Sequence, residues 1–410
     1  MSTITRCRLC QSTSLAEVLD LGFSALTGVF PATADEVVPT GRLLLLLCQE
    51  CGLAQLADSF PPEQMYGENY GYRSGLNASM VEHLSRTVRR LERLAQTKPG
   101  DVVVDIGAND CTLLKSYQSD SLVRVGIDPT IRKFRDFYPD DVLRVEDFFS
   151  ADAYHRACDR PADLVTSIAM FYDLEDPVAF AADVRDVLAD DGLWHFEQSY
   201  MPWMLKSGAY DTICHEHLEY YSLTTIDRIL RMVDMRIIDV ATNAVNGGSV
   251  SVTAAKASSS RTADRELVDW FLAQERRSRI GEVSTWQSFA ATVRDRQEGL
   301  LELLTSLVGS GRTVQALGAS TKGNVVLQTT GIGAELVRAI GDVNPYKFGR
   351  FMPGTGIPIV SEEEVLADSP DFLLILPWHF RETFMSRLDR YLGDGGHLIL
   401  PLPDIEILGY

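Results

Sequence analysis

Apolar runs alternate with amphipathic segments through the middle of the chain, and this alternation predicts a doubly wound α/β sheet. Four runs have the apolar character of buried parallel strands and end in polar or glycine-containing turns. They are residues 101–110, 122–128, 162–169 and 192–197. Helical spacing predicts a helix from about residue 79 to 96 and another from 177 to 188. A ligand of such a sheet lies beyond the carboxyl ends of its strands.

The last part of the chain predicts a second α/β core. Its expected strands are residues 312–318, 338–342, 372–376 and 397–400. Residues 262–307 are rich in helix formers and are interpreted as a connector. A short apolar strand is also expected at 42–47, near the N-terminus. These patterns divide the chain into three predicted domains, at 1–70, 71–257 and 258–410.

Composition narrows the class of protein. The chain has 410 residues, 45% of them hydrophobic, and a formal net charge of −19. So acidic a balance argues against a broad nucleic-acid or anionic-membrane surface, because binding phosphates relies on clustered lysine and arginine. No apolar run approaches the ~20 residues of a membrane-spanning helix, and the first residues lack an apolar signal core. We therefore expect a cytoplasmic protein with reduced thiols and no membrane partner.

Two CxxC pairs near the N-terminus predict a structural metal site. Cys7 and Cys10 form the first pair, and Cys48 and Cys51 form the second. Four thiolates complete the closed tetrahedral set that Zn²⁺ prefers in structural sites. A redox CxxC and a nucleic-acid-binding zinc module are the alternatives. The paired motifs disfavour the first, and the acidic charge disfavours the second.

The first central strand and its turn indicate S-adenosylmethionine (SAM) as the cofactor. This stretch carries Asp105, Gly107, Asn109 and Asp110. A glycine here lets a ligand approach the backbone closely, but the GxGxxG fingerprint of dinucleotide sites is absent. Asp110 would repel a phosphate. A cationic ligand without phosphate fits these residues better, and SAM is such a ligand.

Acids at later strand ends extend this cofactor prediction. Asp128 ends the second strand, where ribose hydroxyls are held in such folds. Asp147 and Phe148 together suit the amino group and ring face of adenine. Solvated strand ends are the alternative explanation for each acid taken alone. The predicted fold class is therefore α/β, with a small N-terminal zinc-binding domain, a central Rossmann-like SAM domain and a second Rossmann-like domain at the C-terminus.

The segment 211–217 carries the candidate chemistry. It ends in His215, Glu216 and His217. Carbon methylation requires a base, because a proton must leave the carbon before that carbon attacks the methyl group, and histidine suits proton transfer near neutral pH. The alternative is a loop whose histidines bond only to backbone. Upstream, Tyr70 and Tyr72 lie on a glycine-rich loop that either lines a polar pocket or fills a domain junction.

Several polar residues in the C-terminal part are candidates for phosphate binding. The loop 318–324 places Ser320, Lys322 and Asn324 after a predicted strand, as in a phosphate cradle that is not a P-loop. A later loop contributes further polar and basic groups that could hold a pyrophosphate. These are Asn344, Lys347 and Arg350. Ordinary solvated loop residues are the alternative.

Taken together, these motifs resemble the SAM-dependent C-methyltransferases of nucleotide-linked 4-keto deoxysugars, over essentially the whole chain. The resemblance rests on the paired CxxC motifs, residues 70–74, 105–110, 215–217, 246–249 and 318–324. It implies that the enzyme removes the proton at C-3, beside the 4-keto group, and that the enolate takes the methyl group. It implies His217 as the general base, Glu216 as its assistant, and Tyr72 or Tyr70 in the same pocket. It also implies that the C-terminal domain binds the nucleotide.

The chain departs from the family pattern at two positions of the implied site. Cys214 stands where the family often has tyrosine, and Asn246 stands where it commonly has histidine. Both remain candidate substrate-binding residues, although Cys214 also fits an inert pocket thiol. The alternatives are methylation at C-5 or another carbon, a nicotinamide oxidoreductase, and a non-catalytic binding protein. A monomer with a small-molecule nucleotide-sugar substrate is expected.

Overall fold

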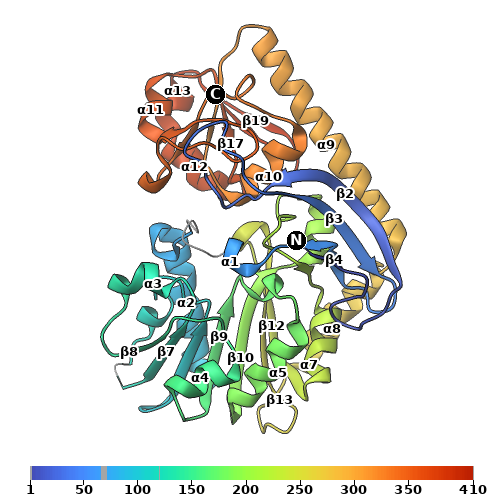
Figure 1. The fold of residues 1–410 in the computed structure, drawn as a ribbon, viewed down its shortest axis with the longest axis vertical. Helices are drawn as coiled ribbons and strands as arrows, with labels where there is room; N and C mark the ends of the chain where they lie inside the picture. The colour runs from blue at the N-terminus through green and yellow to red at the C-terminus, as the bar shows by residue number, and fades with distance from the viewer. Residues whose placement is uncertain (1, 66–71, 120, 410) are drawn as a thin grey trace.

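A computed structural model describes residues 2–65, 72–119 and 121–409, and it has the predicted α/β architecture (Figure 1). Two large, mainly parallel sheets lie at opposite ends of the molecule, and a smaller antiparallel sheet from the N-terminal part lies beside both. None of the helices in the described part is long and apolar enough to cross a membrane.

The central sheet has the order β12-β13-β10-β9-β6-β7-β8. Its strands are β6 (Val102–Ile106), β7 (Val123–Ile127), β8 (Val142–Val145), β9 (Ala162–Ile168), β10 (Leu188–Ser199), β12 (Met235–Asn243) and β13 (Ser249–Lys256). Every residue of β6 is buried, as a strand covered on both faces requires. The strand order reverses at β6, which lies between β7 and β9. Such a reversal leaves a crevice beyond the carboxyl ends of the strands, and a doubly wound sheet binds its ligand there.

Helices cover both faces of the central sheet. They are α2 (Ala78–Ala95), α3 (Ile131–Phe134), α4 (Ala151–Ala157), α5 (Pro177–Val187), α7 (Leu223–Met232) and α8 (Arg265–Arg277), whereas α6 (Met201–Ser207) packs against the long helix α9 (Val283–Gly309). Apolar residues of α2 pack on one face, whereas α4, α5 and α7 pack on the other. The helix predicted near residues 79–96 is confirmed as α2. Its N-terminus is capped by Asn77, whose side chain accepts from the backbone N–H of Ser79.

The C-terminal sheet has the order β16-β15-β14-β17-β18-β19. Its strands are β14 (Val314–Leu317), β15 (Ile340–Asp342), β16 (Ile359–Ser361), β17 (Phe372–Ile375), β18 (His397–Leu400) and β19 (Glu406–Leu408). Its helices are α10 (Thr321–Thr330), α11 (Glu362–Ala367), α12 (Arg381–Arg387) and α13 (Asp389–Gly393). This order reverses at β14, between β15 and β17, so the second sheet has its own switch point, the position at which sheets of this kind bind ligands.

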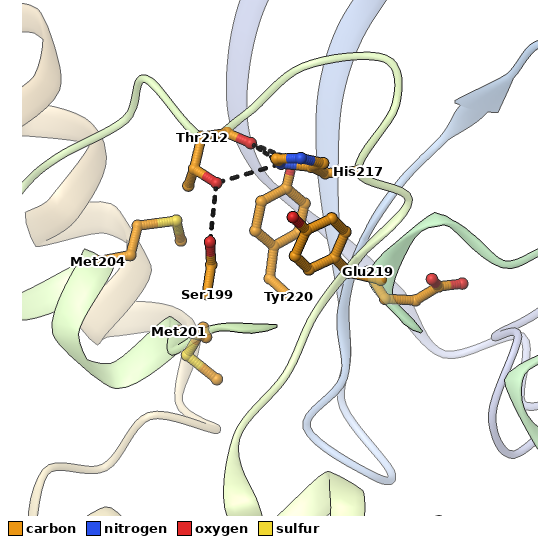
Figure 2. Close-up of a pocket in the computed structure, with 8 residues that line it drawn as sticks. Ser199, Met201, Met204, Thr212, His217, Glu219 and Tyr220 are labelled. Carbon is orange, nitrogen blue, oxygen red and sulfur yellow. Dashed lines mark hydrogen bonds between the residues drawn. The ribbon is translucent and has the colours of Figure 1, made fainter. Parts of the chain in front are cut away.

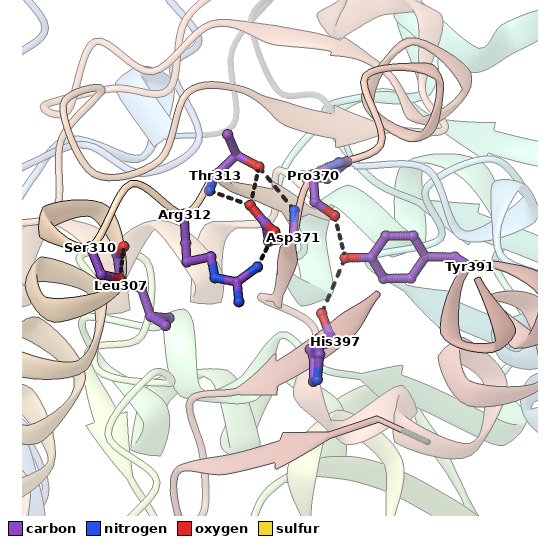
Figure 3. Close-up of polar contacts among 8 residues, drawn as sticks. All are labelled: Leu307, Ser310, Arg312, Thr313, Pro370, Asp371, Tyr391 and His397. Carbon is purple, nitrogen blue, oxygen red and sulfur yellow. Dashed lines mark hydrogen bonds and ion pairs between the residues drawn. The ribbon is translucent and has the colours of Figure 1, made fainter. Parts of the chain in front are cut away.

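Polar contacts at the amino ends of β14 and β17 hold that sheet together on the side away from the crevice (Figure 3). Asp371 accepts from the backbone N–H and the hydroxyl of Thr313 and pairs with Arg312 at 2.8 Å. The bonds from Thr313 and Arg312 lower the pKa of Asp371 to about 2. The Tyr391 hydroxyl also lies within donating distance of the Pro370 carbonyl, at 2.9 Å. These contacts join the segments that precede β14 and β17, so they stabilise the sheet.

The N-terminal part contributes a curved antiparallel sheet with the order β11-β4-β3-β2. Its elements are β2 (Leu15–Ala25), β3 (Thr40–Cys48), β4 (Ala54–Leu56) and β11 (Glu219–Tyr220), with the two-stranded pair β1 (Ser2–Thr3) and β5 (Asp58–Ser59) and the short helix α1 (Pro62–Met65) nearby. The strand expected at 42–47 is confirmed within β3. β2 packs against α10 and the long helix α9 (Val283–Gly309), so this sheet joins the two larger domains (Figure 1).

One buried carboxylate joins α8 to the start of α7. Glu275 is 2% exposed, and it accepts from the Tyr200 hydroxyl, from the backbone N–H groups of Leu223 and Thr224, and from the Thr224 hydroxyl. A carboxylate at this position satisfies orphan donors of the α7 N-terminus and complements the helix dipole.

We expect Glu275→Ala to destabilise the folded protein by roughly 2–4 kcal/mol, because it leaves several buried donors unsatisfied. Urea unfolding followed by circular dichroism measures the shift. Glu298→Ala is the matched control, since Glu298 is an exposed residue of α9. Equal midpoints for the two variants would contradict this account of Glu275.

Candidate active site and cofactor sites

The four N-terminal cysteines converge on one point. Their sulfur atoms all lie within 4.8 Å of one another, and the Sγ–Sγ distances Cys7–Cys51 and Cys10–Cys48 are both 3.5 Å. A tetrahedral Zn²⁺ site with Zn–S bonds of about 2.3 Å has sulfur–sulfur edges of roughly 3.8 Å. The donor set therefore fits Zn²⁺. The site is closed and structural, since four thiolates leave no coordination position for a substrate.

The turn after β6 has the geometry of a close backbone approach. Gly107 has φ +76°, and a Cβ added there would lie 3.3 Å from Cγ of Met170. Asp128, at the end of β7, accepts from the backbone N–H of Asn109 at 2.9 Å. Asp105 is buried and bonded to Thr166, and burial raises its pKa to about 7.

Carboxylates surround this turn. Asp105, Asp110 and Asp128 are all buried there. Asp110 already pairs with Arg73 at 3.3 Å, so Asp105 and Asp128 remain as acceptors for the hydroxyls and amino group of a ligand such as SAM. Carboxylates at this turn disfavour a phosphate. The residues present therefore fit SAM, and they would hold it across the switch point between β6 and β9.

A loop segment before α2 is tied onto the same turn. The backbone N–H of Ser74 donates to Oδ1 of Asn109, and that of Gly75 donates to Oδ2 of Asp110, each at 3.0 Å. Nδ2 of Asn109 donates to the Tyr72 carbonyl at 3.2 Å. Asn109 and Asp110 thus act first as anchors for this loop, a role that their sequence positions did not indicate.

Other residues predicted to lie near the cofactor are more exposed than the carboxylates at this turn. The Tyr72 side chain is 47% exposed, and Tyr70 lies outside the described residues. Phe148 is 43% exposed, and Asp147 pairs with Arg156 at 3.3 Å on the surface. Their assignment to the substrate pocket and to adenine stays a prediction.

The three consecutive residues of the His-Glu-His segment point to different partners. Nε2 of His215 donates to the Gly41 carbonyl at 3.1 Å, and its ring packs edge-on against Phe60. Glu216 accepts from the hydroxyl of Thr27 at 3.0 and 3.1 Å. Both residues thus anchor the loop to the N-terminal part. Burial also lowers the pKa of His215 and keeps it neutral.

His217 has a different environment. Its Nδ1 lies 2.7 Å from the Thr212 carbonyl and 3.2 Å from the Thr212 hydroxyl. A carbonyl only accepts, so Nδ1 must carry the proton and Nε2 keeps its lone pair. The His217 ring also packs at 4.1 Å from the ring of Tyr172. Thr212, and not Glu216, therefore orients this imidazole.

A small cavity adjoins His217 (Figure 2). It encloses about 10 Å³, which is close to the space of one water molecule. Its lining residues are Tyr172, Ser199, Met201, Met204, Thr212, His217, Glu219 and Tyr220. The Thr212 hydroxyl links His217 to Ser199, whereas the carboxylate of Glu219 points away from His217 (Figure 2).

Burial and a nearby cation keep His217 unprotonated. Burial is the larger cause and the positive charge of Lys322 the second, and together they lower the pKa of His217 to about 3. A neutral imidazole with an Nε2 lone pair can accept a proton, and a negative charge that develops on a substrate beside it would raise this low pKa and strengthen the base.

The ligand crevice of the C-terminal sheet faces this site. Nε1 of Trp378, just after β17, donates to Oδ2 of Asp211 at 2.8 Å. Lys322 donates to the Asn246 carbonyl, and a Cβ added to Gly247 would lie 3.1 Å from the Trp378 ring. The structure therefore brings together three predicted residues, Asn246, His217 and Lys322, from two domains.

Two residues that follow β17, Trp378 and His379, were not predicted from the sequence. Nδ1 of His379 is buried without a hydrogen-bond partner among the described residues, and burial with the charge of Lys322 lowers its pKa to about 3. The position of both residues directly after an apolar strand was the available signal, because strand carboxyl ends carry ligands in this architecture.

The predicted phosphate-binding residues are largely engaged within the protein. The Ser320 hydroxyl caps α10. Asn324 differs, because it is fully buried and neither of its amide atoms is paired in the described part. Lys347 donates to the Ala319 carbonyl and pairs with Asp342 at 3.2 Å.

Two further predicted residues serve loop structure. Asn344 accepts from the backbone N–H of Tyr346, and Arg350 donates to the carbonyls of Tyr346 and Phe30. The pyrophosphate assignment of the 344–350 loop stays a prediction.

Cys214 is fully buried, and burial raises its pKa well above the usual thiol value, so it remains a neutral thiol.

Comparisons with known proteins agree with this arrangement. Three family models match successive parts of the chain: a zinc binding domain at residues 7–66, a methyltransferase domain at 80–240 and a C-methyltransferase C-terminal domain at 244–403. The chain is also 30% identical to the C-methyltransferase NovU of Streptomyces niveus, over 99% of this chain and 97% of that protein.

Solved methyltransferase structures resemble under half of the chain. The plantazolicin methyltransferase BpumL with S-adenosylhomocysteine is 13% identical, covers 45% of this chain and 87% of its own, and has a TM-score of 0.36. CalO1, a methyltransferase in calicheamicin biosynthesis, is 14% identical, covers 43% of this chain and 55% of its own, and has a TM-score of 0.34.

The fold, the cysteine cluster and the matched domains define a zinc-containing, SAM-dependent methyltransferase. The chain belongs to the C-methyltransferase family that includes NovU, and its reaction is a C-methylation. The family, the enzyme class and both cofactors predicted from the sequence are confirmed.

We expect Gly107→Ala to weaken SAM binding by ~10-fold or more, because its Cβ would crowd the turn beside Met170. Gly100→Ala is a matched control: Gly100 also has positive φ, at +92°, but a Cβ there meets nothing within 4 Å. Isothermal titration calorimetry of SAM with both variants measures the difference. Equal losses of affinity would mean that backbone strain alone explains the effect.

Proposed function

We propose that the chain methylates C-3 of a nucleotide-linked 4-keto-6-deoxysugar, with His217 as the general base. The observation that carries this proposal is the bond from Nδ1 of His217 to the Thr212 carbonyl, which leaves the Nε2 lone pair available. A hydrogen beside a ketone is acidic enough for a positioned imidazole to remove, provided that the enolate oxygen is stabilised. SAM supplies the methyl group, and S-adenosylhomocysteine is the product.

The residues around His217 support this assignment. Nε2 takes the C-3 proton, and the electron pair of the broken C–H bond moves towards the 4-keto oxygen. Lys322 carries a positive charge close enough to lower the pKa of His217, and we assign it to stabilising the developing oxyanion. For this role the Lys322 ammonium would give up its hydrogen bond to the Asn246 carbonyl and donate to the substrate oxygen instead.

The two facing crevices support a substrate with two recognisable parts. We propose that residues 71–257 bind SAM, that 258–410 bind the nucleotide, and that 1–70 form the zinc domain. Trp378 and His379 follow β17 at the second switch point, and Trp378 donates to Asp211. Their placement favours them over the 344–350 loop as contacts for the nucleotide-linked portion. A cytoplasmic monomer is part of the same proposal.

Methylation at C-5 or another activated carbon is the nearest alternative, because it would use the same base and cofactor. Product NMR separates the carbons.

We expect incubation with SAM and dTDP-linked 4-keto-6-deoxysugars in D₂O to give a product heavier by one methyl group. His217→Gln should lower kcat by roughly 10²–10⁴-fold while SAM binding persists, because only the base is lost. His155→Gln is the control, since His155 is an exposed histidine on α4. Mass spectrometry with detection of S-adenosylhomocysteine measures both. Unchanged turnover in His217→Gln would remove His217 from the base role.

The pH dependence provides a second test. Because the pKa of His217 is lowered to about 3, its base form persists well below pH 6, and the acid limb of the kcat profile should lie below the usual histidine range. Lys322→Met should move that limb to higher pH, since removal of a positive charge raises the pKa of His217. An acid limb near pH 6.5 in the unmodified enzyme would contradict this expectation.

A further inference from the structure

Arg8 connects the zinc site to the strand that follows the proposed base. It lies between two zinc ligands of the first CxxC pair, and its side chain is 3% exposed. Nη1 donates to the Leu56 carbonyl at 2.7 Å, and the backbone N–H donates to Oε1 of Gln55 at 3.0 Å. Both partners belong to β4, the strand that begins shortly after the second CxxC pair.

The same guanidinium reaches β11. Its Nε lies 3.2 Å from a carboxylate oxygen of Glu175 and 3.6 Å from one of Glu219. Glu219 is fully buried, and neither of its carboxylate oxygens has a hydrogen-bond partner in the described part of the chain. An arginine cannot lose its charge in a protein, so this buried cation depends on its carboxylates for compensation.

Backbone bonds continue from this pair to His217. β4 and β11 are antiparallel neighbours, and the N–H of Leu56 donates to the Leu218 carbonyl at 2.8 Å. The N–H of Leu218 donates in turn to the carbonyl of Tyr172, whose ring packs on His217. The residue directly after His217 is therefore held on both sides, by the N-terminal sheet and by the SAM domain.

We propose that Arg8 is a positioning residue for His217, and that the zinc site acts on the reaction by holding Arg8 in place. The inference rests on the proposed base role of His217. Zinc ligation fixes the chain on both sides of Arg8, and Arg8 fixes β4 against β11. Small displacements of a catalytic group lower turnover steeply, by about 10²-fold for 1 Å in unfavourable cases.

The variants separate positioning from folding. Burial raises the pKa of Glu219 well above its usual range, and Arg8 is the cation that favours the charged form of this carboxyl. Arg8→Met leaves the buried carboxyl without that partner and removes the bond to the Leu56 carbonyl, so it lowers both stability and kcat. Arg8→Lys keeps the charge but loses the planar fork, and we expect partial recovery of kcat. The double variant Arg8→Met/Glu219→Gln leaves no ionisable carboxyl without a cation and should regain much of the thermal stability. It should not regain kcat, because the connection to β11 is still missing.

Arg6→Met is the matched control. Arg6 lies next to Cys7, but its side chain is exposed and bonds only to the nearby Gln11 carbonyl in the described structure. We expect wild-type zinc content, stability and kcat for this variant. For Arg8→Met we expect kcat to fall by ~10–100-fold, with zinc content retained and SAM affinity within about twofold of wild type.

The decisive measurement is the tautomer of His217 in the zinc-loaded full chain, which requires no substrate. Two-bond ¹H–¹⁵N spectra of the histidine-labelled protein resolve seven histidines, and His217→Gln assigns the relevant signals. We expect a single Nδ1–H tautomer in the wild type, and a mixture in Arg8→Met, in the double variant and after zinc removal by a chelator.

Each outcome decides the proposal. A wild-type tautomer in Arg8→Met, or in the chelated protein, would overturn it, as would recovery of both stability and kcat in the double variant. If the tautomer shifts as expected but His217→Gln still turns over, the connection to Arg8 stands and the base assignment fails. The two proposals therefore fail separately.

Discussion

The hydrogen bond between Nδ1 of His217 and the Thr212 carbonyl is the constraint on which the site depends. A backbone carbonyl can only accept, so the bond selects one tautomer without a carboxylate partner. It also closes a short loop on itself, because the two residues are close in sequence. The consequence is that Glu216 is free to bond to Thr27, and the loop is anchored to the N-terminal part at the same time.

The arrangement of sheets gives this loop its importance. Each of the two large sheets has one switch point, at β6 and at β14, and the loop from 211 to 217 lies between the two crevices. Asp211 contacts Trp378 of the C-terminal domain, whereas His215 contacts Gly41 of the N-terminal sheet. A single segment therefore meets all three parts of the chain, and small shifts among them act directly on His217.

The sequence predicted the features that depend on local pattern. Buried strands such as β6 have continuous apolar runs, and four thiols in two CxxC pairs have few alternative uses, so both were predictable. β11 was not, because two residues carry no periodicity and form a strand only where β4 supplies a partner. The partner of Lys347 could not be predicted either. Its position after a strand suggests that it binds an anionic ligand, but the carboxylate of Asp342 lies 3.2 Å from its ammonium group.

The two departures from the family pattern have a common physical consequence. Cys214 is fully buried, so a neutral thiol fills the position where the resembling enzymes often have a phenol. Asn246 has φ +54°, a left-handed conformation that asparagine tolerates better than most residues, and this turn directs its carbonyl to Lys322. Neither side chain offers a group that titrates near neutral pH. Proton transfer in the proposed reaction therefore falls to His217, which makes the positioning of this one imidazole decisive for turnover.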